Sequence, residues 1–275
     1  MKNSTSVKFL YGTVPGRFLL KTIQKLHLDR IAVWFLRSSL SRGVIPWYIK
    51  NNQIPMEKFV EEKYGTFRDF FLREKKEYVY NENPNHLISP CDGYLSVFPI
   101  EKDKGFHLKG SYYKVSDLVK DEKIADKFKE GTCLVFRLCA SDYHHYCFID
   151  NGTVEKTQYI EGQLHSVQPI ACETYPVFSL NRRMWSYLET ENFGPVCQVE
   201  IGALVVGGIV NEILEGSFKR GQKKGRFELS GSTIVLFMEK DSIELKPEIL
   251  EALKDNPEAR VTMGMWIGDK KNGKD

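Results

Sequence analysis

The stretch RFELSGSTIVLF, residues 226–237, places a turn directly before an apolar run. The run predicts a buried β-strand over residues 233–239. At the mouth of that strand, the hydroxyl of Ser232 can attack the carbonyl carbon of Gly231 and turn the amide into an ester. Elimination then releases the upstream chain and leaves dehydroalanine, which hydrolyses to an electron-poor pyruvoyl ketone. Gly231 suits this chemistry because it adds little bulk and tolerates a strained turn.

Short β-type runs separated by turns occupy much of the chain around this strand. Besides residues 233–239, we predict strands over residues 94–100, 132–139, 153–160, 196–203 and 205–210. Long helices between them are scarce, and the tail adds a helix over residues 247–254 and a strand-like segment around residues 261–267. The pattern predicts an α+β protein with a mainly antiparallel β sandwich or barrel-like core behind N-terminal helices.

The first fifty residues are basic and amphipathic, with nine Lys or Arg side chains against one acidic residue, Asp29. Apolar residues recur there at helical spacing in two segments: Leu19, Ile23 and Leu26, then Ile31, Trp34 and Phe35. Such helices either lie in the interface of an anionic membrane or pack on the protein's own core. We assign residues 1–80 to a helical, basic, membrane-associating segment and residues 81–275 to a β-rich catalytic domain.

Two further helices are predicted before the β-rich part begins. One starts at Pro55 and extends to Tyr64, where Gly65 stops it. The other is short and follows Thr66 and Asp69, which form a capping box.

The composition indicates an intracellular protein with reduced thiols. The longest apolar run near the N-terminus covers residues 31–36, far short of the about 20 residues that span a bilayer. We find no signal-peptide pattern there. The six cysteines include no Cys-x-x-Cys pair and suggest no disulfide framework. No binding motif accompanies the basic residues, so nucleic acid is not an expected partner.

Self-cleavage requires a base for Ser232 and a group that orients the base. Asp92 lies in a turn that leads into the strand predicted over residues 94–100. His144 follows the strand predicted over residues 132–139, where a side chain can project into a cleft. The alternative to a catalytic role for Asp92 is that it only forms the turn, and for His144 that it is a structural, hydrogen-bonded histidine of the core. A zinc site formed by Asp142, His144, His145 and Cys147 is a weaker alternative, because these ligands are crowded and no distant Cys or His pair completes the set.

These segments resemble the phosphatidylserine decarboxylases, a family that makes its own pyruvoyl group. The resemblance covers nearly the whole chain. It rests on TFRDFFLR at residues 66–73, ISPCDG at 88–93, DYH at 142–144, GQLHSVQP at 162–169, NRR at 181–183, ENFGP at 191–195, EIGA at 200–203 and FELSGST at 227–233. Each motif alone is weak, but their order over about 200 residues makes chance unlikely to explain them.

The resemblance implies roles for individual residues. Ser232 is the self-cleaving nucleophile and then the pyruvoyl residue, so the precursor would yield chains of residues 1–231 and 232–275. Asp92 and His144 correspond to members of the family's Asp-His-Ser relay. The family usually reads Tyr-His-Arg-x-His, whereas this chain has His145 at the third position and Cys147 at the fifth. The maturation base is therefore left open among His144, His145 and a Cys147 thiolate, and slow or absent processing is a further outcome.

The function implied by the resemblance is pyruvoyl-dependent decarboxylation of phosphatidylserine to phosphatidylethanolamine, without a metal or an external cofactor. Two alternatives remain: a pyruvoyl decarboxylase for another serine-like amine, and a non-maturing, non-catalytic lipid-binding relative. The expected partners are an anionic phospholipid membrane and the two chains of one precursor, and a homodimer is left open. The expected location is cytoplasmic, peripheral on the inner face of the cell membrane.

Overall fold

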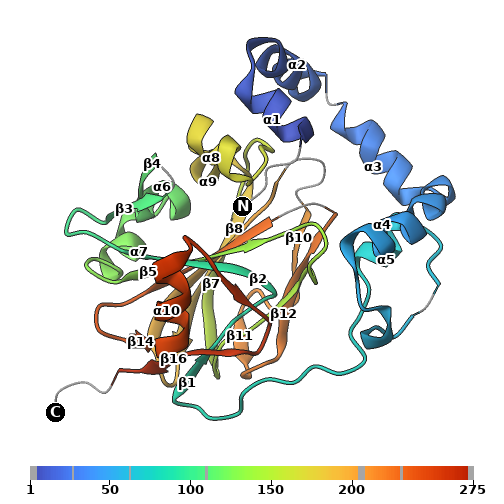
Figure 1. Ribbon diagram of the computed structural model, residues 1–275. Coiled ribbons are helices and arrows are strands. Elements are labelled where there is room, and N and C mark those ends of the chain that lie inside the picture. The colour runs from blue at the N-terminus through green and yellow to red at the C-terminus, as the bar shows by residue number, and fades with distance from the viewer. Residues whose placement is uncertain are drawn as a thin grey trace.

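The computed structural model describes residues 5–26, 28–61, 63–108, 111–203, 208–229 and 232–271 (Figure 1). Its centre is an eight-stranded antiparallel sheet in the order β11-β7-β8-β9-β13-β5-β2-β15. The strands are β2 (Gly93–Pro99), β5 (Thr132–Leu138), β7 (Gly152–Ile160), β8 (Arg183–Thr190), β9 (Gly194–Ile201), β11 (Gly216–Phe218), β13 (Ser232–Met238) and β15 (Ala259–Val261). Within the described ranges β11 and β15 are the edges, so the sheet is open rather than a closed barrel.

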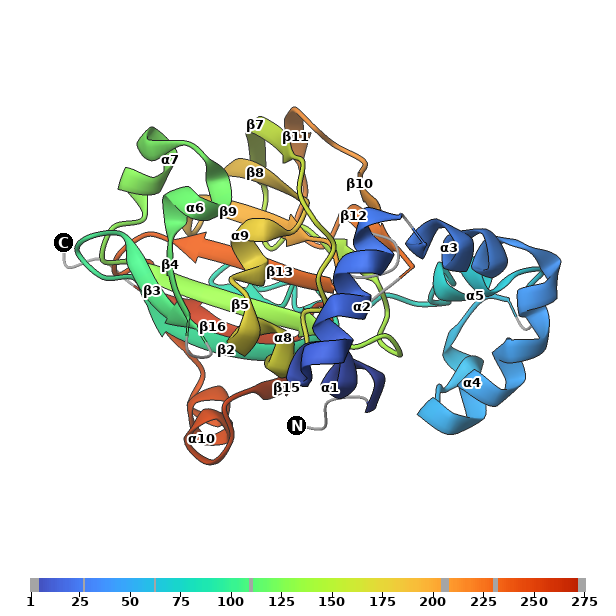
Figure 2. The same ribbon diagram turned by 90° about the horizontal axis from the view of Figure 1, so that it is seen from above.

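Both faces of the main sheet are buried. Because successive side chains of a strand point to opposite faces, each strand contributes to two separate cores. On β13, Val235 and Phe237 belong to one apolar core and Ile234 and Leu236 to a second. A hairpin and short helices cover the first face: β3 (Gly105–Leu108), β4 (Ser111–Lys114), α6 (Val115–Val119), α7 (Glu122–Lys127), α8 (Pro169–Thr174) and α9 (Val177–Leu180). Figure 2 shows α6, α8 and α9 along this face.

Two three-stranded antiparallel sheets contribute side chains to the second core. One has the order β10-β12-β6, formed by β10 (Gly208–Asn211), β12 (Lys223–Glu228) and β6 (His145–Cys147). The other has the order β1-β16-β14, formed by β1 (His86–Ile88), β16 (Trp266–Lys270) and β14 (Ile243–Leu245). Helix α10 (Pro247–Asp255) inserts Ile249 into the same core. The predicted α+β, sandwich-like arrangement is confirmed.

The N-terminal part is helical. Its elements are α1 (Thr5–Gly12), α2 (Val14–Lys25), α3 (Asp29–Arg37), η1 (Ser39–Val44), α4 (Ile45–Asn52), η2 (Met56–Lys58) and α5 (Phe67–Phe71). Helices α1 and α2 adjoin the first core, whereas α3, α4 and α5 gather at one end of the molecule (Figures 1 and 2). No helix among the described residues is long and apolar enough to cross a membrane.

The predicted elements differ from the structure in three places. The helix predicted from Pro55 is wrong beyond Lys58, because Phe59 forms a β-bridge with Lys75 and the described residues from there to Thr66 form no helix. The segment around residues 261–267 is not one strand, since a turn at Gly264, with φ +83°, separates β15 from β16. The strand predicted over residues 205–210 begins outside the described residues, and β10 starts at Gly208.

The remaining predicted strands and the helix over residues 247–254 are confirmed within about two residues at each end. The Thr66 half of the predicted capping box is confirmed, because its hydroxyl oxygen accepts a hydrogen bond from the Asp69 backbone N–H at 3.1 Å.

Candidate active site

Ser232 and His144 meet where β13 begins. Ser232 is the first residue of β13 and is paired with Leu138 of β5, and the loop after β5 returns His144 to it. The His144 Nδ1 atom lies 3.2 Å from the Ser232 Oγ atom, and its Nε2 atom lies 2.9 Å from the carbonyl oxygen of Cys139. Because a carbonyl oxygen only accepts, Nε2 carries the hydrogen in the neutral ring. Nδ1 is then the acceptor that faces the Ser232 hydroxyl.

The surroundings of His144 keep its ring neutral. The side chain is fully buried and stacks on Phe71 with ring centroids 4.2 Å apart. Burial lowers the pKa of His144 to about 3, although the negative charge of Asp142 opposes the shift. The imidazole is therefore in its proton-accepting form at neutral pH. Ser232 is itself only 1% exposed, so the pair is shielded from bulk water.

Asp142 fixes the loop that carries His144. One carboxylate oxygen accepts a 2.7 Å hydrogen bond from the Cys139 backbone N–H, and the other accepts one from Arg260 at 2.8 Å. The buried Arg73 donates to the carbonyl oxygen of Ser141 from a distance of 2.9 Å. These contacts hold the Cys139 carbonyl where it can orient the histidine. Sequence reasoning considered Asp142 only as a metal ligand and did not single out Phe71, although both lie within the motifs of the resemblance.

The strand upstream of the predicted cleavage site is bonded to the same loop. β12 pairs with β6, and the Phe227 backbone N–H donates a 2.9 Å hydrogen bond to the carbonyl oxygen of His144. The next described residues are Glu228 and Leu229, and Leu229 has a left-handed φ of +46°. Gly231 lies outside the described residues. The chain is thus hydrogen-bonded beside His144 at Phe227, and it is held again at Ser232, which pairs with Leu138 in the sheet.

Asp92 has other partners in this structure. Its carboxylate accepts hydrogen bonds from the Lys75 ammonium at 3.1 and 3.2 Å and from the Met263 backbone N–H at 2.8 Å. Both ring nitrogens of His144 are occupied by Ser232 and Cys139. The structure therefore brings together two of the three predicted relay residues and places Asp92 in a separate ion pair.

His145 and Cys147 have partners other than Ser232. His145 stacks on Tyr143, and its Nε2 atom lies 3.3 Å from the carbonyl oxygen of Leu72. The Cys147 thiol is buried and accepts a hydrogen bond from the Tyr78 hydroxyl at 2.9 Å. Burial raises the pKa of Cys147 to about 12, which disfavours a thiolate. Of the three candidate bases, His144 alone contacts the nucleophile.

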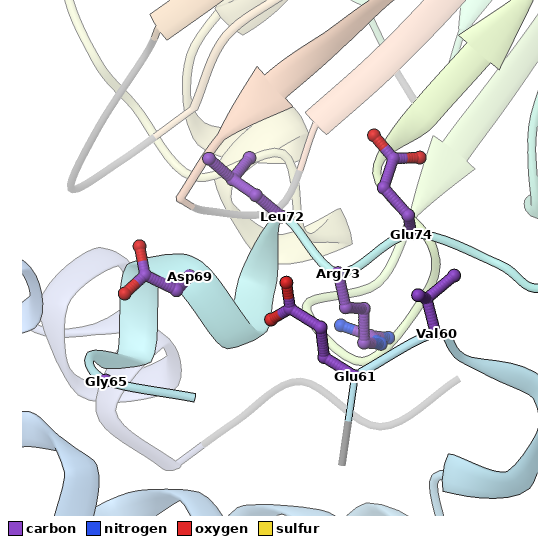
Figure 3. Close-up of a pocket in the computed structure, with 7 residues that line it drawn as sticks. All are labelled: Val60, Glu61, Gly65, Asp69, Leu72, Arg73 and Glu74. Carbon is purple, nitrogen blue, oxygen red and sulfur yellow. The ribbon is translucent and has the colours of Figure 1, made fainter. Parts of the chain in front are cut away.

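A pocket of about 440 Å³ lies beside α5 (Figure 3). It is lined by Val60, Glu61, Gly65, Asp69, Leu72, Arg73 and Glu74. Two of these residues also support the histidine segment, because the Leu72 carbonyl oxygen contacts His145 and Arg73 holds the loop before His144. The pocket is therefore adjacent to the residues that position the serine–histidine pair. Within the described part of the chain, no cluster of His, Cys, Asp or Glu side chains could hold a metal ion.

The fold and site define a β-rich protein in which a buried serine is the first residue of a central strand and contacts a neutral histidine. Residues 67–269 match the family described as phosphatidylserine decarboxylase. The chain is 41% identical over 266 residues to phosphatidylserine decarboxylase proenzyme 2 of Clostridium acetobutylicum, with 96% of this chain and 91% of that protein covered. This chain belongs to the phosphatidylserine decarboxylase family.

Two other relatives extend the comparison. The phosphatidylserine decarboxylase proenzyme of Clostridium perfringens is 38% identical over 275 residues, covering 96% of this chain and 92% of that protein. The proenzyme of Desulfitobacterium hafniense is 34% identical over 271 residues, covering 95% and 91%. The similarity therefore includes the N-terminal helices as well as the β-rich part.

Proposed function

We propose that this protein is a precursor that cuts itself between Gly231 and Ser232 and then decarboxylates phosphatidylserine to phosphatidylethanolamine. The observation that carries the proposal is the 3.2 Å contact between His144 Nδ1 and Ser232 Oγ. The relatives named as proenzymes support the same reading. The products of cleavage are a large chain of residues 1–231 and a small chain of residues 232–275.

His144 is the base in this proposal. Its Nδ1 atom takes the hydroxyl proton while Ser232 attacks the Gly231 carbonyl carbon, and the Cys139 carbonyl oxygen keeps the hydrogen on Nε2. The ester that forms then breaks by elimination: the α-hydrogen of residue 232 is lost as a proton and Gly231 departs as a carboxylate. Addition of water to the resulting dehydroalanine releases ammonia and leaves the ketone. A thiolate at Cys147 is disfavoured because the raised pKa keeps this thiol protonated at neutral pH.

The residues present fit a pyruvoyl group at position 232. Its source, the Ser232 side chain, is shielded from water and contacts a neutral histidine, as the elimination requires. The pyruvoyl ketone would supply an electron sink for loss of carbon dioxide from an amino acid headgroup. During cleavage His144 passes the Ser232 proton to the nitrogen of residue 232 as the amide becomes an ester. In each later turnover a new proton from solvent would reach the substrate's α-carbon through the same Nδ1 position.

Asp92 completes the proposed relay, as the family resemblance implies. In the uncut chain it is paired with Lys75 and does not contact His144. Its participation therefore requires an exchange of partners. An Asp92→Asn variant tests this role: slower self-cleavage supports it, and an unchanged rate removes Asp92 from maturation.

We place the N-terminal helices on the membrane surface, with residues 1–80 as the membrane-associating segment of the catalytic domain that follows. Leu19 and Leu26 of the predicted apolar stripe are exposed, whereas the neighbouring Leu20 is buried in the core. Phe18 and Trp34 are 75% and 65% exposed. Exposed aromatic residues on basic helices suit an anionic interface, where each Lys or Arg contributes about 1 kcal/mol.

Denaturing electrophoresis of the purified protein, combined with a carbonyl-reactive probe, tests maturation. We expect two bands with the label on residues 232–275, and a single unlabelled band from a Ser232→Ala variant. Release of carbon dioxide from phosphatidylserine vesicles, compared with soluble serine analogues, then tests the substrate. An uncut wild-type chain without carbonyl label would contradict the proposal and favour a non-catalytic lipid-binding relative.

Flotation with anionic phospholipid vesicles tests the membrane surface. Trp34→Ser and Phe18→Ser should weaken binding, whereas Leu214→Ser should not, because Leu214 is 53% exposed but lies outside residues 1–80. Equal binding by all three variants would remove these helices from the docking surface.

A further inference from the structure

Two arginines from different helices hold one carboxylate, that of Glu228. The Arg68 guanidinium of α5 lies 2.6 Å from Glu228 Oε1, and the Arg37 guanidinium at the end of α3 lies 3.2 Å from Oε2. The Glu228 side chain is only 14% exposed, so solvent screens these charges less than it screens ordinary surface pairs. We call Arg37, Arg68 and Glu228 the arginine clamp.

The clamp acts on the strand that leads to the cleavage site. Glu228 is the last residue of β12 and lies three positions before Gly231. The residue on its N-terminal side, Phe227, bonds to the His144 backbone, and Leu229 on its other side has a left-handed φ of +46°. A non-glycine residue in this region persists only when its surroundings hold it. Leu229 is itself buried in the second core, and the clamp adds ion pairs at the residue directly before it.

Helix α5 joins this anchor to the base. Phe71 stacks on the His144 ring, and Arg68, one helical turn earlier, holds Glu228. Because both contacts come from one short helix, α5 fixes the upstream strand relative to the imidazole. Arg37 adds a link to α3, the helix that exposes Trp34.

We propose that the arginine clamp positions the Gly231 carbonyl for attack by Ser232. The proposal rests on the self-cleavage proposed above and assigns Glu228 and Arg68 as positioning residues. Attack requires the reacting atoms about 3–3.5 Å apart, and a misplacement of about 1 Å can slow a reaction by about a hundredfold. Removing the clamp takes away the ion pairs that hold the end of β12, so we expect the peptide bond after this strand to meet Ser232 less often in a reactive geometry.

The test measures cleavage of newly made chains in a cell-free translation reaction, followed by electrophoresis over time. We expect Glu228→Gln and Arg68→Gln to slow cleavage by about ten- to a hundredfold. The charge swap Arg68→Glu with Glu228→Arg, made in an Arg37→Gln background so that no like charge faces the new arginine, should recover part of the rate lost in Arg68→Gln. Glu251→Gln is the matched control, because Glu251 forms a 2.7 Å ion pair with Lys254 on the exposed face of α10.

Two measurements separate positioning from loss of folding. Once fully cut, the clamp variants should release carbon dioxide at the wild-type rate per carbonyl group, and their melting temperatures in a Ser232→Ala background should match that of the control. A wild-type cleavage rate in Glu228→Gln would overturn the clamp. Slow cleavage that the charge swap does not improve, together with a lowered melting temperature, would also refute the positioning role of the clamp. If the wild-type chain itself stays whole, the proposed function fails instead.

Discussion

The rate of self-cleavage should hardly depend on pH between 5 and 8. Burial lowers the pKa of His144 to about 3, so at pH 5 about 1% of this imidazole is protonated. An exposed histidine with an ordinary pKa of about 6.5 would be about 97% protonated at pH 5, and cleavage would slow by about thirtyfold. The structure instead predicts a change of less than about twofold, because the base stays neutral throughout this range.

Pulse-labelled precursor from cell-free synthesis provides the assay. Labelled chains are transferred to buffers from pH 5 to pH 8, and formation of the two chains is followed by electrophoresis. His144→Ala and Ser232→Ala should remain whole at every pH and serve as controls. A rate that falls about thirtyfold with a midpoint near pH 6.5 would refute the reasoning, because it would show a base with an ordinary pKa.

Three further predictions concern buried groups. Cys147→Ser should cleave within about twofold of the wild-type rate, since burial raises the pKa of this thiol to about 12, and a large loss would restore the thiolate alternative. Glu200→Gln should lower the free energy of unfolding by about 3–5 kcal/mol in urea titrations, because it removes the negative charge that compensates the fully buried Lys224 ammonium 2.8 Å away. Acidification from pH 7 to 5 should lower the free energy of unfolding by about 2 kcal/mol through His144. The His144 pKa is about 6.5 in the unfolded chain and about 3 in the folded chain, so only the unfolded chain binds the proton in this range. The pH dependence of unfolding in a Ser232→Ala background, compared with and without His144→Gln, measures this loss.

The local pattern of the chain was sufficient to predict much of the fold. The apolar run after Ser232 became the central strand β13, and the strands over residues 94–100, 132–139 and 153–160 followed the same logic. A buried strand is recognisable because its side chains are apolar on both faces. The helix predicted from Pro55 failed because Phe59 is engaged by Lys75, a backbone pairing that local periodicity does not contain.

The candidate site divides in the same way. The Gly231-Ser232 bond and the residue types that could serve it are readable from the sequence, because the chemistry requires a hydroxyl beside a small residue and a nearby imidazole. Which imidazole it is, and which group orients it, depends on contacts between segments far apart in the chain. His144 and Ser232 are separated by 88 positions, and their contact exists because β5 and β13 are neighbours in the sheet.

The sequence alone was sufficient to identify the family motifs, the basic helical segment, the β-rich core and the serine at the start of its central strand. Only the tertiary structure places His144 against Ser232 and gives His145 and Cys147 other partners, and it orients the His144 ring through the Cys139 carbonyl. Only the structure paired Asp92 with Lys75 and brought Arg37 and Arg68 to Glu228. The physical reason is that protonation and ion pairing depend on the desolvation and charge around a group, which arise when the chain packs against itself.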